Sequence, residues 1–161
     1  MDTADRAPEL SRHIGYLLRR AQQAHVAVWQ SEVSHQITSV QFGVLSVLAR
    51  TPGASQTELC ARLDLDRSTI ADIVARLERR GLLERIRDAG DKRRNVLSLT
   101  ATGRDELKAL RPKVASVDQV LTENLDDAQI SALRAILTAL VDSPSVRARA
   151  GNLDGASAGK Q

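Results

Sequence analysis

Four basic side chains surround a short turn past the middle of the chain: Arg87, Lys92, Arg93 and Arg94. Guanidinium and ammonium groups bind phosphate, and arginine is attracted to the enhanced negative potential of a narrow DNA minor groove. The turn between them carries two carboxylates, Asp88 and Asp91, which repel phosphate. We therefore expect Asp91 to pair with a nearby arginine and to brace the tip, while the basic flank contacts DNA.

The segments around this turn predict the elements that position it. Apolar runs at residues 82–86 and 96–99 flank the turn and predict a β-hairpin. A helix over residues 67–80 precedes the hairpin and ends at Gly81, a common left-handed terminator. A shorter helix to about Leu63 begins at the capping box Ser55-Gln56-Thr57-Glu58, and a tight turn follows it. Two helices joined by such a turn and followed by a basic hairpin are typical of a winged helix-turn-helix.

The helix over residues 67–80 has two distinct faces. Ile70, Ile73, Val74 and Leu77 share one face and predict a core contact. Small residues on the opposite face allow the helix to enter a major groove about 12 Å wide. Asp72 there is expected either to accept from a cytosine amino group or to hold Arg76 as an i,i+4 partner. The candidate DNA contacts of the two helices are Ser55, Gln56, Arg67, Ser68, Thr69, Asp72, Arg76 and Arg79.

Composition and charge agree with a globular protein that binds double-stranded nucleic acid. Hydrophobic residues make up 42% of the 161 residues, but aromatic residues only 2%, which argues against stacking on single strands. Residues 67–94 contain nine Arg or Lys and five Asp or Glu, so this segment has a net charge of +4. The whole chain has a net charge of +3, so the remaining residues sum to −1. The N-terminus lacks the apolar segment of a signal peptide, and no apolar run would cross a bilayer. We therefore expect a cytoplasmic protein.

The whole chain predicts a mainly α fold: a winged helix-turn-helix with a two-stranded hairpin wing and dimerisation helices at both ends. The expected organisation is a flexible N-terminus (1–8), a domain over residues 9–142 and a disordered tail (143–161). Within that domain, about 38–100 form the DNA-binding part, and helices at about 9–35 and 101–142 flank it. These flanking helices carry apolar stripes that need a partner, and a second copy of the chain is the simplest one.

Several motifs resemble the MarR family of bacterial transcriptional regulators, over roughly residues 10–141. They are Gln56-Thr57-Glu58-Leu59, Leu65-Asp66-Arg67-Ser68-Thr69-Ile70, residues 74–82, and Asp91-Lys92-Arg93 through Leu99-Thr100-Ala101-Thr102-Gly103. The resemblance implies an obligate homodimer, mostly a repressor, that binds a short pseudo-palindrome and is released by a small, often aromatic, ligand. It also implies that Asp91 pairs with Arg93 and that Arg93 or its neighbours enter the minor groove. Ala89 departs from the family, where proline is frequent.

A ligand site is expected on the first two helices, because family ligands bind between the dimerisation helices and the DNA-reading domain. The candidate residues are His13, Tyr16, Arg20, Trp29 and Phe42. Three of them, His13, Tyr16 and Arg20, share a helix face, and the arginine would meet a carboxylate. Residues 14–23 resemble a subgroup that controls the breakdown of aromatic acids, hydroxynicotinate among them. Ordinary packing of a long helix would explain the same pattern equally well.

Other sites and other functions find less support in the sequence. The histidines at 13, 25 and 35 are spaced so that they point to different faces, so we expect no metal site and no cofactor. The lone cysteine, Cys60, is better interpreted as a small buried hydrophobic residue than as an oxidation sensor. No nucleophile–base pair or glycine-rich phosphate loop indicates an enzyme. An architectural DNA-binding protein without a ligand and a winged helix that binds protein stay open as alternatives.

Overall fold

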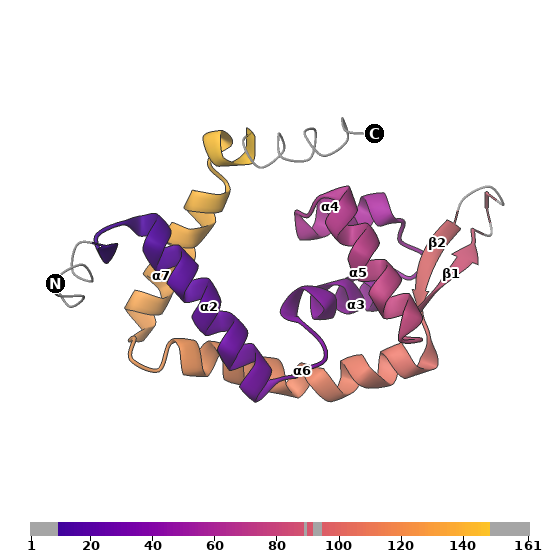
Figure 1. Cartoon of the computed structure of the whole chain (residues 1–161), viewed down its shortest axis with the longest axis horizontal. Helices are drawn as coiled ribbons and strands as arrows, with labels where there is room; N and C mark the ends of the chain where they lie inside the picture. The colour runs from indigo at the N-terminus through magenta and orange to yellow at the C-terminus, as the bar shows by residue number, and fades with distance from the viewer. Residues whose placement is uncertain (1–9, 89, 92–94, 149–161) are drawn as a thin grey trace, which may run out of the picture. The chain divides into compact units, whose positions relative to one another are not determined.

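Helices make up most of the structure, as the sequence predicts, and a two-stranded antiparallel sheet completes it (Figure 1). The computed structural model describes residues 10–88, 90–91 and 95–148. Its elements are α2 (Ile14–Glu32), α3 (Ser39–Arg50), α4 (Gln56–Leu63), α5 (Arg67–Arg79), β1 (Leu83–Arg87), β2 (Asn95–Leu99), α6 (Ala101–Leu121) and α7 (Asp127–Val141). None of the helices in these residues is long and apolar enough to cross a membrane.

The chain divides into two units. One comprises residues 1–39 and 109–123, which include α2 and the second half of α6. The other comprises residues 40–108 and 124–161, which include most of α3, then α4, α5, the hairpin, the start of α6 and α7. The second unit therefore contains every element of the predicted winged helix-turn-helix.

The helix ends follow the predicted capping residues. Ser55 Oγ accepts from the backbone N–H of Glu58 at 3.2 Å, and the Glu58 carboxylate accepts from the Ser55 N–H at 2.7 Å, which confirms the capping box of α4. Gly81 follows α5 with φ 68°, a left-handed conformation that costs glycine little. Asp126 and Gln129 form a second capping box at the start of α7.

The hairpin is joined to the helices by a short strand contact that the sequence did not predict. β1 pairs with β2 in the register Leu83 opposite Leu99 and Arg87 opposite Asn95. On the other edge of β2, the N–H of Leu97 donates to the Ala54 carbonyl at 3.0 Å, and the N–H of Gly53 donates to the Leu97 carbonyl at 3.0 Å. The hairpin is thereby fixed beside the residue that precedes the α4 N-cap.

The motif Leu99-Thr100-x-x-Gly103 forms the junction between the hairpin and α6. Thr100 Oγ1 donates to the Gly81 carbonyl at 2.6 Å and accepts from the Gly103 N–H at 3.0 Å, so it caps α6. A Cβ on Gly103 would lie 1.8 Å from the carbonyl oxygen of Leu82. The motif therefore requires glycine because α6 packs directly against the backbone at the start of the hairpin.

The ends of the described chain differ from the prediction. The helix expected from about residue 9 begins at Ile14, after a turn at residues 11–12. Residues 144–148 form a short helical segment, whereas a disordered tail was expected from residue 143. The N–H groups of Val146 and Arg147 donate to the Ser143 carbonyl there, which closes the first turn. The expected flexible N-terminus and the rest of the expected tail lie outside the described residues.

Candidate nucleic-acid interface

Helix α5 is amphipathic in the sense that a groove-reading helix requires. Ile70, Val74 and Leu77 are fully buried, and Ile73 is half-buried, so the predicted core face is confirmed. The candidate contact residues that are exposed to solvent on α5 are Arg67, Ser68, Asp72, Arg76 and Arg79. Thr69 is half-buried at the helix start. The arrangement leaves a polar and basic surface outside and anchors the helix by its apolar side.

An ion pair between Asp72 and Arg76, one of the two alternatives expected for Asp72, does not form in the described part of the chain, whose ion pairs include Arg85 with Glu78 and Arg147 with Asp142. Both side chains of the expected pair are exposed, and solvent competes effectively for such a contact. The second interpretation of Asp72, as an acceptor for a base amino group, stays a prediction.

The start of α5 is organised by Asp66, the N-cap residue. Its carboxylate accepts from the backbone N–H of Thr69 at 2.7 Å, from Thr69 Oγ1 at 2.5 Å and from Ser68 Oγ at 2.5 Å. These bonds, first the one from the Ser68 hydroxyl, hold the pKa of Asp66 far below the usual range of a carboxyl. Asp66 is therefore ionised at neutral pH and acts only as an acceptor.

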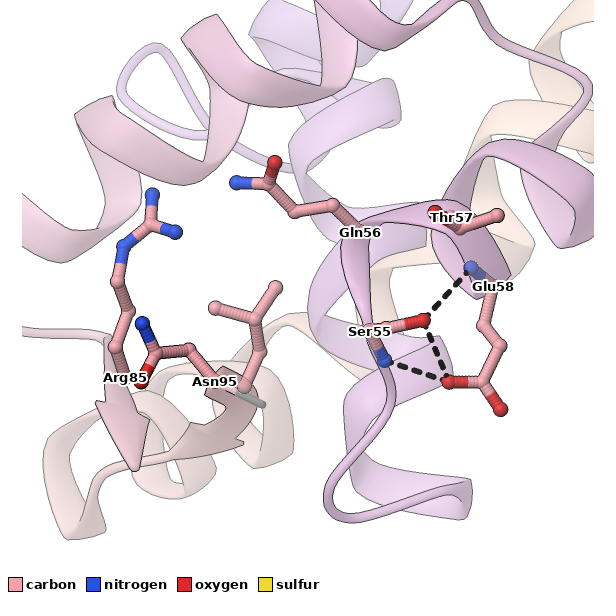
Figure 2. A pocket seen from close by; sticks show the side chains of 7 residues that line it. Ser55, Gln56, Thr57, Glu58, Arg85 and Asn95 are labelled. Atoms are coloured by element: carbon pink, nitrogen blue, oxygen red, sulfur yellow. Dashed lines mark hydrogen bonds between the residues drawn. The ribbon is translucent and has the colours of Figure 1, made fainter. Parts of the chain in front are cut away.

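A cleft of about 550 Å³ separates the start of α4 from the hairpin (Figure 2). Gln56 and Thr57 lie on the helix side, and Arg85 and Asn95 lie on the strand side. Arg85 Nε donates to Glu78 of α5 at 3.1 Å, and both terminal nitrogens of Arg85 lie 3.2 Å from one amide atom of Gln56, which accepts from them when that atom is the oxygen. One arginine thus links α4, α5 and β1.

The described part of the wing tip contains an Asx-type turn. The carboxylate of Asp88 accepts from the Gly90 N–H at 2.8 Å, so one of the two tip carboxylates supports the backbone. Arg87 ends β1 and is exposed, as is Asp91. The other predicted contacts, Lys92, Arg93 and Arg94, lie outside the described residues, as does Ala89. The predicted brace between Asp91 and Arg93 stays a prediction.

Three of the predicted ligand-binding residues lie together on α2 and its N-cap. His13 is the N-cap residue and is exposed, and Tyr16 is half-buried one turn later. The guanidinium carbon of Arg20 lies 6.0 Å from the centre of the Tyr16 ring, and that of Arg19 lies 5.2 Å from it. Both arginines therefore approach the same aromatic ring, although only Arg20 was predicted to contact a ligand.

Trp29 lies in the core of its unit. Its side chain is 5% exposed, and its indole N–H donates to the Ile37 carbonyl at 2.6 Å. This bond ties the connection after α2 to the end of that helix. A cavity of about 70 Å³ next to it is far below the several hundred Å³ of typical ligand pockets. Phe42 is a half-buried residue of α3 in the other unit. The roles of both residues in ligand binding stay predictions.

Sequence reasoning did not single out Asp66, Arg85 or Ala54. The pattern Asp66-x-x-Thr69 at a helix start is an N-cap signal that would have indicated the first. Arg85 alternates with Arg87 in a strand, so the period of two places both on one face of the hairpin. The contact between Ala54 and Leu97 has no local signal, because it joins residues far apart in the sequence.

The described geometry defines a winged helix-turn-helix: α4 and α5 joined by a turn at Asp64, with a hairpin fixed beside them. Comparison with known proteins gives the family. A family model described as the MarR family matches residues 35–94. The chain is 33% identical to the transcriptional repressor NicR of Pseudomonas putida over 84% of its length and 86% of that protein. This chain belongs to the MarR family, whose members are DNA-binding transcriptional regulators and not enzymes.

Solved structures agree with this assignment. The regulator PcaV of Streptomyces coelicolor, in complex with its natural ligand, is similar with a TM-score of 0.78 and 40% identity, over 83% of this chain and 95% of that one. BpsR of Bordetella bronchiseptica, whose DNA binding is regulated by 6-hydroxynicotinic acid, is similar with a TM-score of 0.76 and 30% identity. Its match covers 83% of this chain and 96% of that one.

Proposed function

We propose that this protein is a homodimeric, sequence-specific repressor that is released from its operator by a small aromatic acid. The observation that carries the DNA-binding part is helix α5, whose apolar face is buried while its exposed face is polar and basic, next to a basic hairpin. A cytoplasmic location follows from this function, since the protein must reach the chromosome. The relative NicR is a repressor, which supports repression over activation for this protein.

The homodimer is proposed from exposed apolar side chains on the terminal helices. Helix α7 is amphipathic in sequence, yet it buries no residue within the single chain. Ile136 is 63% exposed, and Leu137 and Val141 are also exposed. On α2, Ile14 is likewise 63% exposed. Large exposed apolar stripes on helices are typical of interaction surfaces, and a two-fold dimer would cover the same stripe on both copies.

In the proposed complex, each α5 enters a major groove and each wing reaches the neighbouring minor groove. The residues proposed to contact DNA are those predicted from the sequence, from Ser55 and Gln56 of α4 to Arg94 of the wing. Arg76 and Arg79, exposed in the last turns of α5, supply positive charge for phosphates. Two-fold symmetry would place the recognition helices about 34 Å apart, one turn of DNA.

The ligand class is proposed from the charge on α2 and from the relatives. Arg20 and Tyr16 offer a guanidinium and an aromatic ring in one place, which suits a planar acid. The DNA binding of BpsR is regulated by 6-hydroxynicotinic acid, a compound of this kind. We therefore propose a small aromatic carboxylate as the effector, held by Arg20 with His13 and Tyr16.

Arg93→Ala is expected to weaken DNA binding by about 1–3 kcal/mol and to lower the slope of log affinity against log salt by about one. The physical reason is the loss of one guanidinium from the minor groove or a phosphate. Titration of labelled operator DNA at several salt concentrations measures both quantities. Arg111→Ala, which removes an exposed arginine of α6 outside the proposed interface, is the matched control. Equal affinities of the Arg93 variant and the wild type at low and high salt would contradict a DNA contact by the wing.

Arg20→Ala is expected to abolish the release of DNA by aromatic acids while leaving DNA binding itself in place. The variant lacks the guanidinium that would pair with the ligand carboxylate. A panel of small aromatic acids, tested by thermal shift and by release of operator DNA, measures the response. Arg19→Ala is the matched control, because Arg19 approaches the same tyrosine ring but has no proposed ligand contact. An unchanged response of the Arg20 variant to every acid in the panel would rule out this pocket.

A further inference from the structure

Two hydroxyl groups at the start of α5 are both bonded to the carboxylate of Asp66. Ser68 Oγ and Thr69 Oγ1 each lie 2.5 Å from an oxygen of the Asp66 carboxylate. Ser68 is exposed and Thr69 is half-buried at the start of α5, and their hydroxyls share the Asp66 carboxylate. Both were predicted to reach base edges or phosphates, and Asp66 determines which of these partners they can bind.

Each hydroxyl carries one proton and two lone pairs. The carboxylate of Asp66 is ionised, since its hydrogen bonds hold its pKa far below the usual range, and an ionised carboxylate only accepts. The proton of each hydroxyl therefore points toward Asp66. What remains for DNA on both side chains is a pair of acceptor sites.

This polarity selects among the groups that DNA presents. Phosphate oxygens only accept, so they cannot pair with a hydroxyl whose proton is already committed. In the major groove, adenine presents its N6 amino group and cytosine its N4 amino group as donors, whereas guanine O6 and N7 and thymine O4 accept. Acceptor-only hydroxyls fit the two amino groups and oppose the other edges.

We propose that Asp66 is a positioning residue that fixes the Ser68 and Thr69 hydroxyls as acceptors, so that the start of α5 selects adenine or cytosine through their exocyclic amino groups. The inference rests on the proposed DNA contacts of α5 and adds their direction. The amino group could come from either base, and base preference in the selected operator distinguishes the two.

Asp66→Asn tests this role because asparagine caps a helix about as well as aspartate. An amide keeps one acceptor oxygen for the Thr69 N–H but replaces the other oxygen with an N–H₂ donor. At least one hydroxyl must then turn its proton outward and can donate to guanine, thymine or phosphate. Asp126→Asn is the matched control, since Asp126 caps α7 through the same bond to the N–H of the third residue, at 2.8 Å.

The experiment selects operators from random DNA with the wild type, then measures affinities for every single-base variant of the operator. Ser68→Ala and Thr69→Val identify the positions that the two hydroxyls read. At these positions, the wild type is expected to prefer adenine or cytosine by roughly 5-fold to 10-fold. Asp66→Asn is expected to lose that preference at one of these positions at least and to keep it elsewhere, and Asp126→Asn is expected to keep it throughout.

Two results would overturn the inference alone. One is a wild type that prefers guanine or thymine at the positions read by Ser68 and Thr69. The other is an Asp66→Asn variant with uniformly lower affinity and unchanged base preferences, which would reduce Asp66 to a helix cap. A wild type that selects no sequence would overturn the proposed function together with the inference.

Discussion

Gly103→Ala is expected to prevent stable folding, with a loss of more than about 4 kcal/mol in the free energy of unfolding. The added Cβ would lie 1.8 Å from the Leu82 carbonyl oxygen and 2.8 Å from its carbonyl carbon. These are backbone atoms, and the Leu82 carbonyl also accepts from the Thr100 N–H at 3.2 Å, so the clash has no flexible side chain to displace. The hairpin and α6 would have to separate.

Gly15→Ala is the matched control for this substitution. Gly15 lies in α2, and a Cβ there would meet no atom within 4 Å. Alanine in an exposed helix is expected to raise stability by up to about 1 kcal/mol relative to glycine. Thermal and urea unfolding at equal protein concentration measure both variants. A Gly103 variant as stable as the Gly15 variant would contradict the close approach of α6 to Leu82.

Trp29→Ala is expected to lower the free energy of unfolding by about 3–5 kcal/mol. The indole is 5% exposed, and its removal would leave a cavity and an Ile37 carbonyl without its donor. Trp29→Phe keeps most of the apolar area and loses the N–H, so its expected cost is smaller, about 1–3 kcal/mol. The midpoint of thermal unfolding is expected to fall in the same order, with Tyr16→Ala, at a half-buried site, as a milder control.

The same variants separate the two roles considered for Trp29. A structural role lowers stability whether or not an aromatic acid is present. A pocket role alone would leave the stability of the ligand-free protein unchanged and would remove the thermal shift on adding the ligand. An unaltered melting temperature of Trp29→Ala without ligand would contradict the packing described for α2.

The elements of the interface were predictable where the signal is local. The capping box of α4 and the glycine after α5 each depend on a few neighbouring residues, and Ser55 and Gly81 confirm them. The need for glycine at 103 was recognisable only as a motif, because its cause is the Leu82 backbone across the hairpin.

Contacts between distant residues set the limit of sequence reasoning at this site. The bridge between Ala54 and Leu97 and the link from Arg85 to Gln56 and Glu78 depend on packing that no periodicity encodes. Asp72 shows a related limit, because an i,i+4 spacing permits an ion pair with Arg76 but does not stabilise it in solvent. The buried position of Trp29 was likewise not predictable from the sequence, since an aromatic residue on an amphipathic helix can line a pocket or pack in a core.

We propose above that a two-fold dimer reads a specific DNA sequence through α5 and the wing. Selection of bound fragments from a random DNA pool, followed by footprinting of the best sequence, tests it most directly. We expect a pseudo-palindrome whose half-sites lie about one helical turn apart, with protection by one dimer. Recovery of no preferred sequence, or of a single site without a symmetric partner, would contradict it.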